Sequence, residues 1–450
     1  SPQTAMIIGM SPKKIIYRYS RHEDWVKELQ RHFPSLKKEI ARHWDRFHVR
    51  SRELWRLLSG FRPLYPSTFL SFLRPRYWLL LIRAIRLLPD FFKPLERQLH
   101  WPKTPSSRKP QIEIEDYRRL LNEQLMITAQ STIDRVPSAV AMLGLCYPED
   151  THYPIGGMGK FISRLEERAQ DLGLEISLKT KVTSIEKRGE EYFVKEQKGR
   201  EYRAKKLICN NPLWNIPALL NTGVAKLKHK VKKQSQNNTR SWGANSAHFL
   251  FKVQEREVYR DALYYQLHLS EDIKRRWKEE YAQEWGFGLK DLCSSESLFF
   301  SFSPSNEKTQ EGEVVGTVST HIEISHLASL IPLSRKQRKN GDYLKYKQAF
   351  SQLVQLVWES YFGKAEFRSL KVATPQTFER YTGRAFGRVG GLPFDDLRLP
   401  LFYPQALTAD PHFFRLGDTV FPGQGVVGVV AGALNLKAFL DKQDKPKDKV

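Results

Sequence analysis

Apolar residues recur every three or four positions through much of the first third of the chain, as at Leu36, Ile40 and Trp44. This spacing puts them on one face of an α-helix. We therefore predict that residues 20–146 are mostly helical, with breaks at their prolines. A polar stretch at 101–110, which contains several prolines and serines, is expected to be a linker within this region.

The pattern changes between residues 175 and 209, where apolar and polar residues alternate over short runs. Alternation of this kind is typical of half-buried β-strands. More strand-like runs follow at 246–253, 263–269, 297–303 and 314–323, and a helical run follows at 342–361. The chain closes with one more strand, a glycine-rich turn, an apolar helix and a solvated tail.

The glycine-rich turn at 423–428 (GQGVVG) matches the dinucleotide-binding pattern G-x-G-x-x-G. Too few residues follow it for the second strand and acidic ribose ligand of that motif. What remains is a strand, Gly417-Asp418 and a helix start, where backbone N–H groups can approach a ligand. Packing alone also explains such glycines, and Asp418 suits either ligand hydroxyls or a helix N-cap.

A second glycine-rich turn, at 153–159 (YPIGGMG), precedes an amphipathic helical run at 160–172. Val182 lies about twenty residues beyond this turn, in the first of the alternating runs. The two features together predict a helix followed by a strand hairpin.

The formal net charge of +24 predicts an anionic neighbour, either a phospholipid surface or nucleic acid. The longest apolar run, at 77–88, is interrupted by Arg83 and Arg86 and is too short to span a bilayer. It suits either a buried helix or an interfacial helix whose arginines reach lipid phosphates. Nucleic-acid binding is the weaker interpretation, because the basic residues are dispersed and no aromatic-basic signature accompanies them.

The three cysteines lie far apart and form neither a disulfide pattern nor a zinc-ligand spacing. A reducing compartment and the absence of a metal site are therefore expected. The first residues, from Ser1, have no targeting composition, which suggests a processed or cut chain.

Several stretches resemble the phytoene desaturase type of flavoenzyme, a family that includes carotenoid desaturases, carotenoid cis-trans isomerases and a retinol saturase. The similar stretches are 374–384 with Gly390-Gly391, 416–426, 153–159 with 181–185, and 297–321. They occur in the order that the family shows, from about residue 110 to about residue 440.

The resemblance implies an α/β (α+β) fold in which a split, Rossmann-like FAD-binding domain carries an inserted substrate domain of mixed sheet and helices. The segments would be a mostly helical, substrate- or membrane-associated region at 1–150, the middle FAD-domain segment at 151–215, the substrate domain at 216–400, the C-terminal FAD-domain segment at 401–441 and a disordered tail at 442–450.

The same resemblance implies roles for individual residues. Val182 would contact the adenine end of FAD through its backbone, and Asp418, after Gly417, would bind the ribitol or pyrophosphate. The residues placed against the isoalloxazine are Gly423, Gln424, Gly425 and Val426. Tyr381 and Arg384 are candidates for the substrate site, with bracing of a turn as the alternative, and no catalytic acid or base is assigned.

The activity implied is that of an FAD-dependent oxidoreductase that desaturates or isomerises a carotenoid-like polyene at a membrane surface. A retinol saturase-like reductase, and a basic membrane- or nucleic-acid-binding protein without catalysis, are the alternatives. The expected partners are a lipophilic polyene and an anionic membrane, in a cytoplasmic or plastid-like reducing compartment.

The family opens with a strand and a G-x-G-x-x-G turn for the FAD pyrophosphate, and residues 1–110 contain no such turn. This N-terminal βαβ unit is therefore expected upstream of Ser1. Residues 1–450 alone are expected to bind no FAD and to fold poorly.

Overall fold

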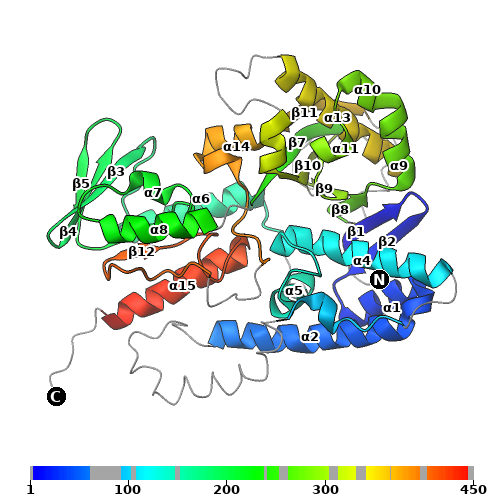
Figure 1. The fold of residues 1–450 in the computed structure, drawn as a ribbon, viewed down its shortest axis with the longest axis horizontal. Helices are drawn as coiled ribbons and strands as arrows, with labels where there is room; N and C mark the ends of the chain where they lie inside the picture. The colour runs from blue at the N-terminus through cyan, green and yellow to red at the C-terminus, as the bar shows by residue number, and fades with distance from the viewer. Residues whose placement is uncertain are drawn as a thin grey trace.

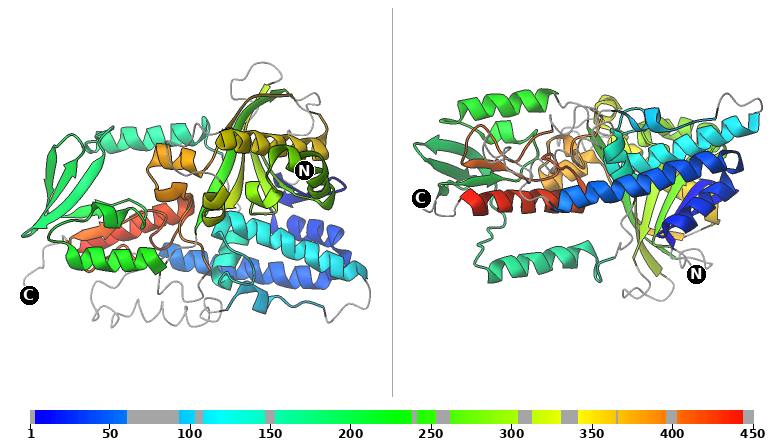
Figure 2. Two further views of the ribbon diagram at one scale, coloured as in Figure 1. Left: turned by 45° about the horizontal axis from the view of Figure 1, so that its top comes forward. Right: turned by 90° about the horizontal axis from the view of Figure 1, so that it is seen from below.

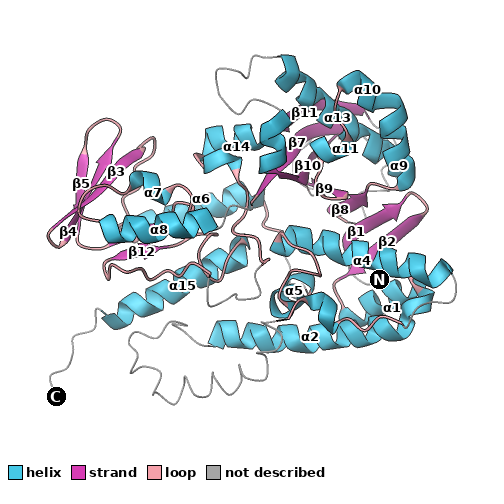
Figure 3. Cartoon of the chain, viewed as in Figure 1, coloured by secondary structure: helices cyan, strands magenta, loops and turns pink. Residues whose placement is uncertain are grey.

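The computed structural model describes two lobes (Figure 1). The described residues are 4–60, 93–102, 108–146, 153–237, 241–252, 262–303, 313–330, 341–364, 366–395 and 403–443. The larger lobe holds a seven-stranded sheet with helices on both faces, and the smaller lobe holds two small sheets and the last helix (Figure 3). The fold is therefore of the mixed α/β class that the resemblance implies.

The large sheet has the strand order β11-β7-β10-β9-β8-β1-β2. Its strands are β1 (Thr4–Ser11), β2 (Lys14–Tyr19), β7 (Trp242–Lys252), β8 (Tyr264–His268), β9 (Ser297–Phe302), β10 (Glu313–Glu323) and β11 (Glu366–Ala373). All neighbours are antiparallel except β1 and β8, which run parallel. The strands predicted between 246 and 323 are confirmed, whereas β1 and β2 were not predicted.

The two faces of this sheet contribute to different hydrophobic cores. Phe300 packs with Trp358 on one face, whereas the preceding residue, Phe299, packs against the core on the other face. Successive side chains of a strand point to opposite faces, so a continuous apolar run indicates a sheet that is covered on both sides.

Helices from distant parts of the sequence supply this cover. The Trp358 side is covered by α13 (Gly341–Phe362) with the shorter α9 (Glu271–Arg276), π-helix η4 (Trp277–Tyr281), α10 (Ala282–Trp285), α11 (Leu289–Leu292) and α12 (Ile324–Leu330) (Figure 1). The other side is covered by α1 (His22–His32), α2 (Lys37–Gly60), α4 (Arg108–Ala129) and α5 (Ser138–Leu145), joined by the 3-10 turns η1 (Pro34–Leu36) and η3 (Leu95–Gln98).

The second group confirms the helices predicted between 20 and 146, as far as that region is described. Its core contains Trp25, Trp44 and Tyr117, and the Trp44 indole donates a 3.0 Å hydrogen bond to the Tyr117 hydroxyl. Helix α4 begins at Arg108, inside the stretch expected to be a linker. The apolar run at 77–88 lies outside the described residues, and none of the described helices is long and apolar enough to cross a membrane.

The smaller lobe contains a parallel pair and an antiparallel sheet. The parallel pair is β6 (Leu207–Cys209) with β12 (Phe413–Arg415), and the antiparallel sheet is β3 (Val182–Arg188), β4 (Glu191–Glu196) and β5 (Glu201–Ala204). Its helices are α6 (Gly157–Asp171), α7 (Ile216–Leu219), α8 (Ala225–Asn237) and α15 (Gly425–Gln443), and α14 (Pro375–Thr382) with the 3-10 turn η6 (Ala385–Gly387) lies between the lobes (Figure 1).

One expected strand is not formed. Residues 175–178 alternate apolar and polar side chains, yet the structure shows them as irregular chain between α6 and β3. A strand needs a partner for its backbone N–H and C=O groups, and no described strand pairs with this segment. The alternating pattern of a strand is therefore present at 175–178, but no described strand pairs with it.

Candidate functional site

Asp418 lies in the turn between β12 and α15, and its nearest charged partner is Arg384. The Asp418 carboxylate is 3.0 Å from the Arg384 Nη2. Arg384 also donates to the carbonyl oxygens of Arg388 (2.7 Å) and Gly390 (2.6 Å). The structure thus brings Asp418, the candidate cofactor residue, next to Arg384, a candidate substrate residue. The bonds from Arg384 to the two carbonyl oxygens also fit its alternative role, the bracing of a turn.

Burial raises the pKa of the Asp418 carboxyl above its usual value, and the positive charge of Arg384 opposes that rise. A buried carboxylate must be paired or hydrogen-bonded to stay charged. Arg384 pairs with this carboxylate, which also accepts hydrogen bonds from the backbone N–H groups of Asp418 and Thr419. The acceptor capacity that remains suits hydroxyl donors of a ligand.

Glycines allow three segments to approach one another closely around Asp418. A Cβ at Gly391 would lie 2.1 Å from the Asp418 carbonyl oxygen, and one at Gly423 would lie 2.5 Å from the Phe394 ring. Gly417 has φ +104° and Gly423 has φ +117°, a region that other residues rarely adopt. These glycines are therefore needed for the shape of the turn. Close packing explains them, and the same lack of side chains lets the backbone approach a ligand.

Gln424 ties the turn to the end of α4 and to the 390–391 segment. Its side-chain amide donates to the Thr128 carbonyl (3.1 Å), and its side-chain oxygen accepts a hydrogen bond from the Gly391 N–H (3.0 Å). The neighbouring Gln130 side chain is buried and donates to the Val389 carbonyl (3.0 Å), while its Oε1 atom has no hydrogen-bond partner. Buried polar atoms are normally hydrogen-bonded, so the Gln130 Oε1 atom is suited to accept a hydrogen bond from a ligand beside the turn.

The start of α15 is open. Gly425, at φ +81°, begins the helix, and a Cβ placed there would meet nothing within 4 Å. Val426 and Val427 follow it with about half of their side-chain surface exposed. The first N–H groups of a helix lack intrahelical partners and carry partial positive charge, so this end can receive an electron-rich group.

Two aromatic residues that the sequence did not single out close one side of the turn. Phe394 and Tyr403 stack with ring centroids 5.4 Å apart. The Tyr403 hydroxyl donates to the Asp418 carbonyl (3.1 Å) and accepts from the Leu392 N–H (3.3 Å). No motif marks these residues, because their role depends on contacts that only the folded chain reveals.

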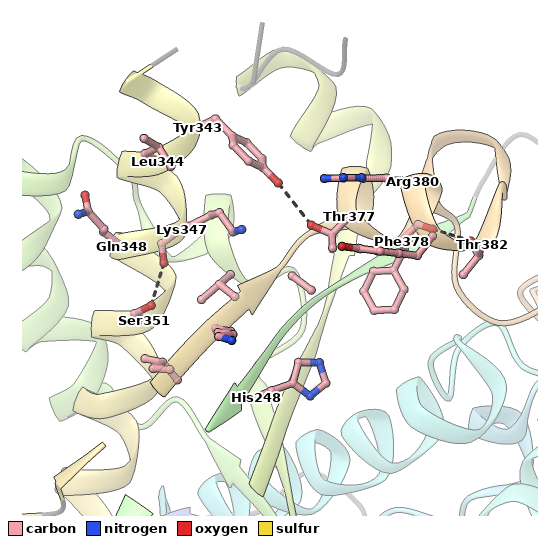
Figure 4. A pocket seen from close by; sticks show the side chains of 15 residues that line it. His248, Tyr343, Leu344, Lys347, Gln348, Ser351, Thr377, Phe378, Arg380 and Thr382 are labelled. Atoms are coloured by element: carbon pink, nitrogen blue, oxygen red, sulfur yellow. Dashed lines mark hydrogen bonds between the residues drawn. The ribbon is translucent and has the colours of Figure 1, made fainter. Parts of the chain in front are cut away.

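Tyr381 lies on α14, and Arg384 follows the end of that helix. Arg384 reaches Asp418, whereas Tyr381 is 76% exposed and lines a separate, open cavity of about 1010 Å³ (Figure 4). Lys347 and Arg380 contribute positive charge to that cavity from α13 and α14. The structure therefore does not bring the two candidate substrate residues into one site.

Val182 lies at the first position of β3, where it pairs with Glu196 of β4. This three-stranded sheet is at one end of the smaller lobe (Figure 1), and the turn around Asp418 belongs to the end of β12. The contact of Val182 with an adenine group stays a prediction.

The turn around Asp418 fits the ring and ribitol end of a flavin. It combines a carboxylate for hydroxyl groups, glycines that let the backbone approach, and a helix start that favours negative charge. Among the described residues, β12 is the only strand that runs into a glycine-rich helix start. The described chain therefore supplies one of the two anchoring points that a dinucleotide needs.

Comparison with known proteins gives relatives over nearly the whole chain. The prolycopene isomerase of Arabidopsis thaliana, described as chloroplastic, is 24% identical over 436 residues, which are 93% of this chain and 65% of that protein. The chloroplastic prolycopene isomerase of Daucus carota is 23% identical over 91% of this chain and 62% of its own length. This chain thus spans slightly less than two thirds of these relatives.

Two solved structures also align with this chain, at lower sequence identity than the relatives above. An oxidoreductase from Methanosarcina mazei aligns with a TM-score of 0.46 at 11% identity, covering 82% of this chain and 74% of that one. A double mutant of putrescine oxidase aligns with a TM-score of 0.45 at 11% identity, covering 98% of this chain and 81% of that one.

A family profile matches the middle of the chain. It describes the flavin containing amine oxidoreductases and covers residues 111–340, just over half of the sequence. This range holds most of the large sheet, with α4 and β3 to β6. The phytoene desaturase type resemblance is consistent with this match and with the prolycopene isomerase relatives. The chain accordingly belongs to the flavin containing amine oxidoreductase family, and its cofactor is FAD.

Proposed function

We propose that this protein is an FAD-dependent oxidoreductase that isomerises or desaturates a carotenoid-like polyene. The proposal rests on one structural observation, the Asp418 carboxylate beside the open start of α15. Relatives named prolycopene isomerase, which align with more than nine tenths of this chain, support the choice of substrate class.

The residues of the turn would hold the ring end of FAD. Asp418 accepts hydrogen bonds from hydroxyl groups, and the α15 start stabilises negative charge that collects on the ring. FAD supplies the capacity to accept or donate a hydride. Gln424 keeps the turn in register with α4 through its bonds to Thr128 and Gly391.

An apolar substrate suits this end of α15. Val426 and Val427 present apolar surface next to the helix start, and we assign no acid or base there. A polyene offers no polar group for a general acid or base, so positioning is the main task of its site. Reduction of a polyene double bond, as in a retinol saturase, uses the same arrangement and is the second candidate reaction.

A membrane surface in a plastid-like, reducing compartment is the proposed location. The chloroplastic relatives, the net charge of +24 and the three free cysteines support it. A lipid-soluble polyene would reach the protein from the bilayer, and anionic headgroups would attract the basic chain.

Product analysis tests the reaction. The full-length protein, loaded with FAD, is supplied with several cis and trans carotenoids, and the products are separated by chromatography. New geometric isomers of unchanged mass indicate isomerisation, and loss or gain of two hydrogens indicates desaturation or saturation. Turnover of amines with no change in any polyene would overturn the proposed substrate class.

A further inference from the structure

The open cavity of about 1010 Å³ lies at one edge of the large sheet. It is lined mainly by α13, by the edge strand β11 and by α14, which lie side by side (Figure 2). None of its lining residues belongs to the turn around Asp418 or to α15. The cavity is therefore separate from the candidate flavin site.

Three basic side chains, one from each of these elements, line the cavity. They are Lys347 of α13, Lys371 of β11 and Arg380 of α14. Figure 4 shows the side chains of Lys347 and Arg380 pointing toward one another across the cavity. Like charges that face one another repel, so this arrangement favours an anion between them.

These three side chains have no anionic partner in the described part of the chain. None of them forms an ion pair or donates a side-chain hydrogen bond there, and the described residues that line the cavity include no Asp or Glu. Glu379, which precedes Arg380 in sequence, instead accepts a hydrogen bond from the Phe386 N–H (3.3 Å). The positive charge of the cavity is therefore not balanced by the residues around it.

Aromatic rings hold two of the cations in place. The Lys347 Nζ lies 5.4 Å from the centre of the Tyr343 ring, and the Arg380 guanidinium carbon lies 5.4 Å from the centre of the Tyr381 ring. A cation–π contact stabilises the charge without using the N–H donors in hydrogen bonds. The donors of both side chains are therefore available to a ligand.

A buried contact fixes the two helices that carry these cations. The hydroxyl of Tyr343, which is buried, forms a 3.0 Å hydrogen bond with the Thr374 hydroxyl at the start of α14. Lys347 lies one helical turn beyond Tyr343, and Arg380 lies on α14. A site whose groups are held in place before the ligand arrives loses less conformational freedom on binding.

The number of cations and the size of the cavity indicate what the ligand is. A phosphate monoester carries a charge of about −1.5 to −2 near neutral pH and three acceptor oxygens, which suits three basic side chains better than a single carboxylate does. A cavity of about 1010 Å³ is much larger than a phosphate ion and takes a small molecule. Leu344, Phe378 and Tyr381 provide apolar surface beside the cations.

We propose that this cavity binds a phosphate monoester carried by a partly apolar molecule, with Lys347, Lys371 and Arg380 as the residues that contact the phosphate. The lysines act as point charges, and the Arg380 guanidinium can donate to two phosphate oxygens at once. The monoester belongs either to a soluble molecule or to a lipid headgroup of the phosphatidic acid type. The inference rests on this cavity alone and is independent of the flavin site and of the proposed reaction.

Calorimetric titration of the full-length, FAD-loaded protein with phenyl phosphate tests the proposal. This probe joins a phosphate monoester to an apolar ring. Lys347→Gln and Arg380→Gln each remove one cation, and Lys347→Arg keeps the charge. The matched control is Lys345→Gln, because Lys345 is an exposed lysine of the same helix that does not line the cavity.

Wild type is expected to bind a single phenyl phosphate per chain, with an affinity that falls as salt is raised. Lys347→Gln and Arg380→Gln should each weaken binding at least about tenfold, because each removes charge-assisted hydrogen bonds. Lys345→Gln should bind like wild type, and Lys347→Arg should keep most of the affinity. Flavin content should be the same in all of these proteins, because the cavity is separate from the flavin turn.

Vesicles of phosphatidylcholine with and without phosphatidic acid identify the source of the phosphate. Weaker binding of phosphatidic acid vesicles by Lys347→Gln than by Lys345→Gln, with competition by phenyl phosphate, assigns the cavity to a lipid headgroup. Equal vesicle binding by these two variants, with their difference for phenyl phosphate retained, assigns it to a soluble molecule. The proposal is overturned if Lys347→Gln and Lys345→Gln bind both probes equally, because the phosphate would then bind elsewhere on the basic surface, or if wild type binds neither probe.

Discussion

The Arg384–Asp418 ion pair links the two candidate roles at residue level. Sequence reasoning placed Asp418 with the cofactor and Arg384 with the substrate, whereas the structure shows a 3.0 Å contact. Arg384 lowers the energy of the charged form of Asp418, which burial otherwise disfavours. The charge of this carboxylate therefore depends on a residue that lies thirty-four positions away in sequence.

Arg384→Gln is expected to make flavin binding more sensitive to acid. Without the guanidinium, the pKa of Asp418 rises further, so the carboxylate is lost at a higher pH as the solution is acidified. Flavin affinity measured by fluorescence quenching across a pH series should fall at higher pH in Arg384→Gln than in wild type. Identical pH profiles would show that Asp418 does not bind FAD as a carboxylate.

Glu123, on α4, has a second buried carboxyl group, and its ionisation should make the free energy of unfolding depend on pH. Glu123 accepts hydrogen bonds from the Ser297 hydroxyl and from the Glu296 N–H (3.0 Å), and burial raises its pKa to about 6. A folded-state pKa above the unfolded value means that this group favours the folded state at low pH. Its contribution is full below the unfolded pKa of 4.5 and is lost as the pH rises through about 6.

The change in the free energy of unfolding should be about 2 kcal/mol between these limits, at 1.36 kcal/mol per pKa unit. Urea unfolding of wild type and Glu123→Gln on both sides of this window measures it. The amide cannot ionise, so the wild type should lose more stability with rising pH than the variant. Parallel pH dependence of the two proteins would contradict a raised pKa at Glu123.

Sequence reasoning could group candidate residues only where a motif was local. Gly417, Asp418 and residues 423–428 lie together in sequence and together in the turn. The bonds from Gln424 to Thr128 and from Gln130 to Val389 span more than 250 positions. No local pattern encodes such pairs, because they depend on how α4 and α15 pack in three dimensions.

At the level of elements, periodicity predicted α13, α15 and the strands β7 to β10. It missed β1 and β2, whose apolar runs are short and lie at the start of the chain. β1 pairs with β8, more than 240 residues away, and β2 pairs with β1 at the edge of the sheet. The opposite error occurred at 175–178, where the alternation is present and the described chain offers no partner strand.

Two glycines of α15 provide a matched test of the helix start. A Cβ at Gly428 would lie 2.5 Å from the Gly423 carbonyl oxygen, whereas one at Gly432 has its nearest atom at 3.5 Å. Gly432→Ala should therefore stabilise the protein by about 0.5–1 kcal/mol through helix propensity alone. Gly428→Ala should instead destabilise it, because it forces the turn and the helix apart.

Chemical unfolding of the two alanine variants and wild type measures the difference. Flavin content is a second readout, and only Gly428→Ala should lower it. If both variants are stabilised alike, the close approach of α15 to its own turn is not required.

For the whole molecule, the net charge of +24 predicts salt-sensitive association with anionic membranes. Co-sedimentation with vesicles should require acidic phospholipid and should weaken as salt is raised from low to physiological ionic strength. Neutral vesicles are the control. Binding that is equal for both lipid compositions would contradict an electrostatic contribution, and preferential sedimentation with nucleic acid would favour the alternative partner.

The division into a helical first segment, a split FAD domain and a substrate domain was expected by resemblance. The structure adds that β1 and β2 join the large sheet, so the first segment and the substrate domain share one core. The expectation that residues 1–450 alone bind no FAD stays a prediction. It rests on the lack of a G-x-G-x-x-G turn within residues 1–110.

The flavin content of the full-length protein with and without the Asp418 carboxylate tests the central claim most directly. Wild type, Asp418→Ala and the matched control Asp441→Ala, whose carboxylate pairs with Lys437 on the exposed side of α15, are purified and titrated with FAD. A lost hydrogen bond to a charged group costs about 1–3 kcal/mol, so Asp418→Ala should bind FAD roughly 5- to 150-fold more weakly. Wild type and Asp441→Ala should bind it equally. Full flavin content in Asp418→Ala would contradict the placement of FAD at this turn.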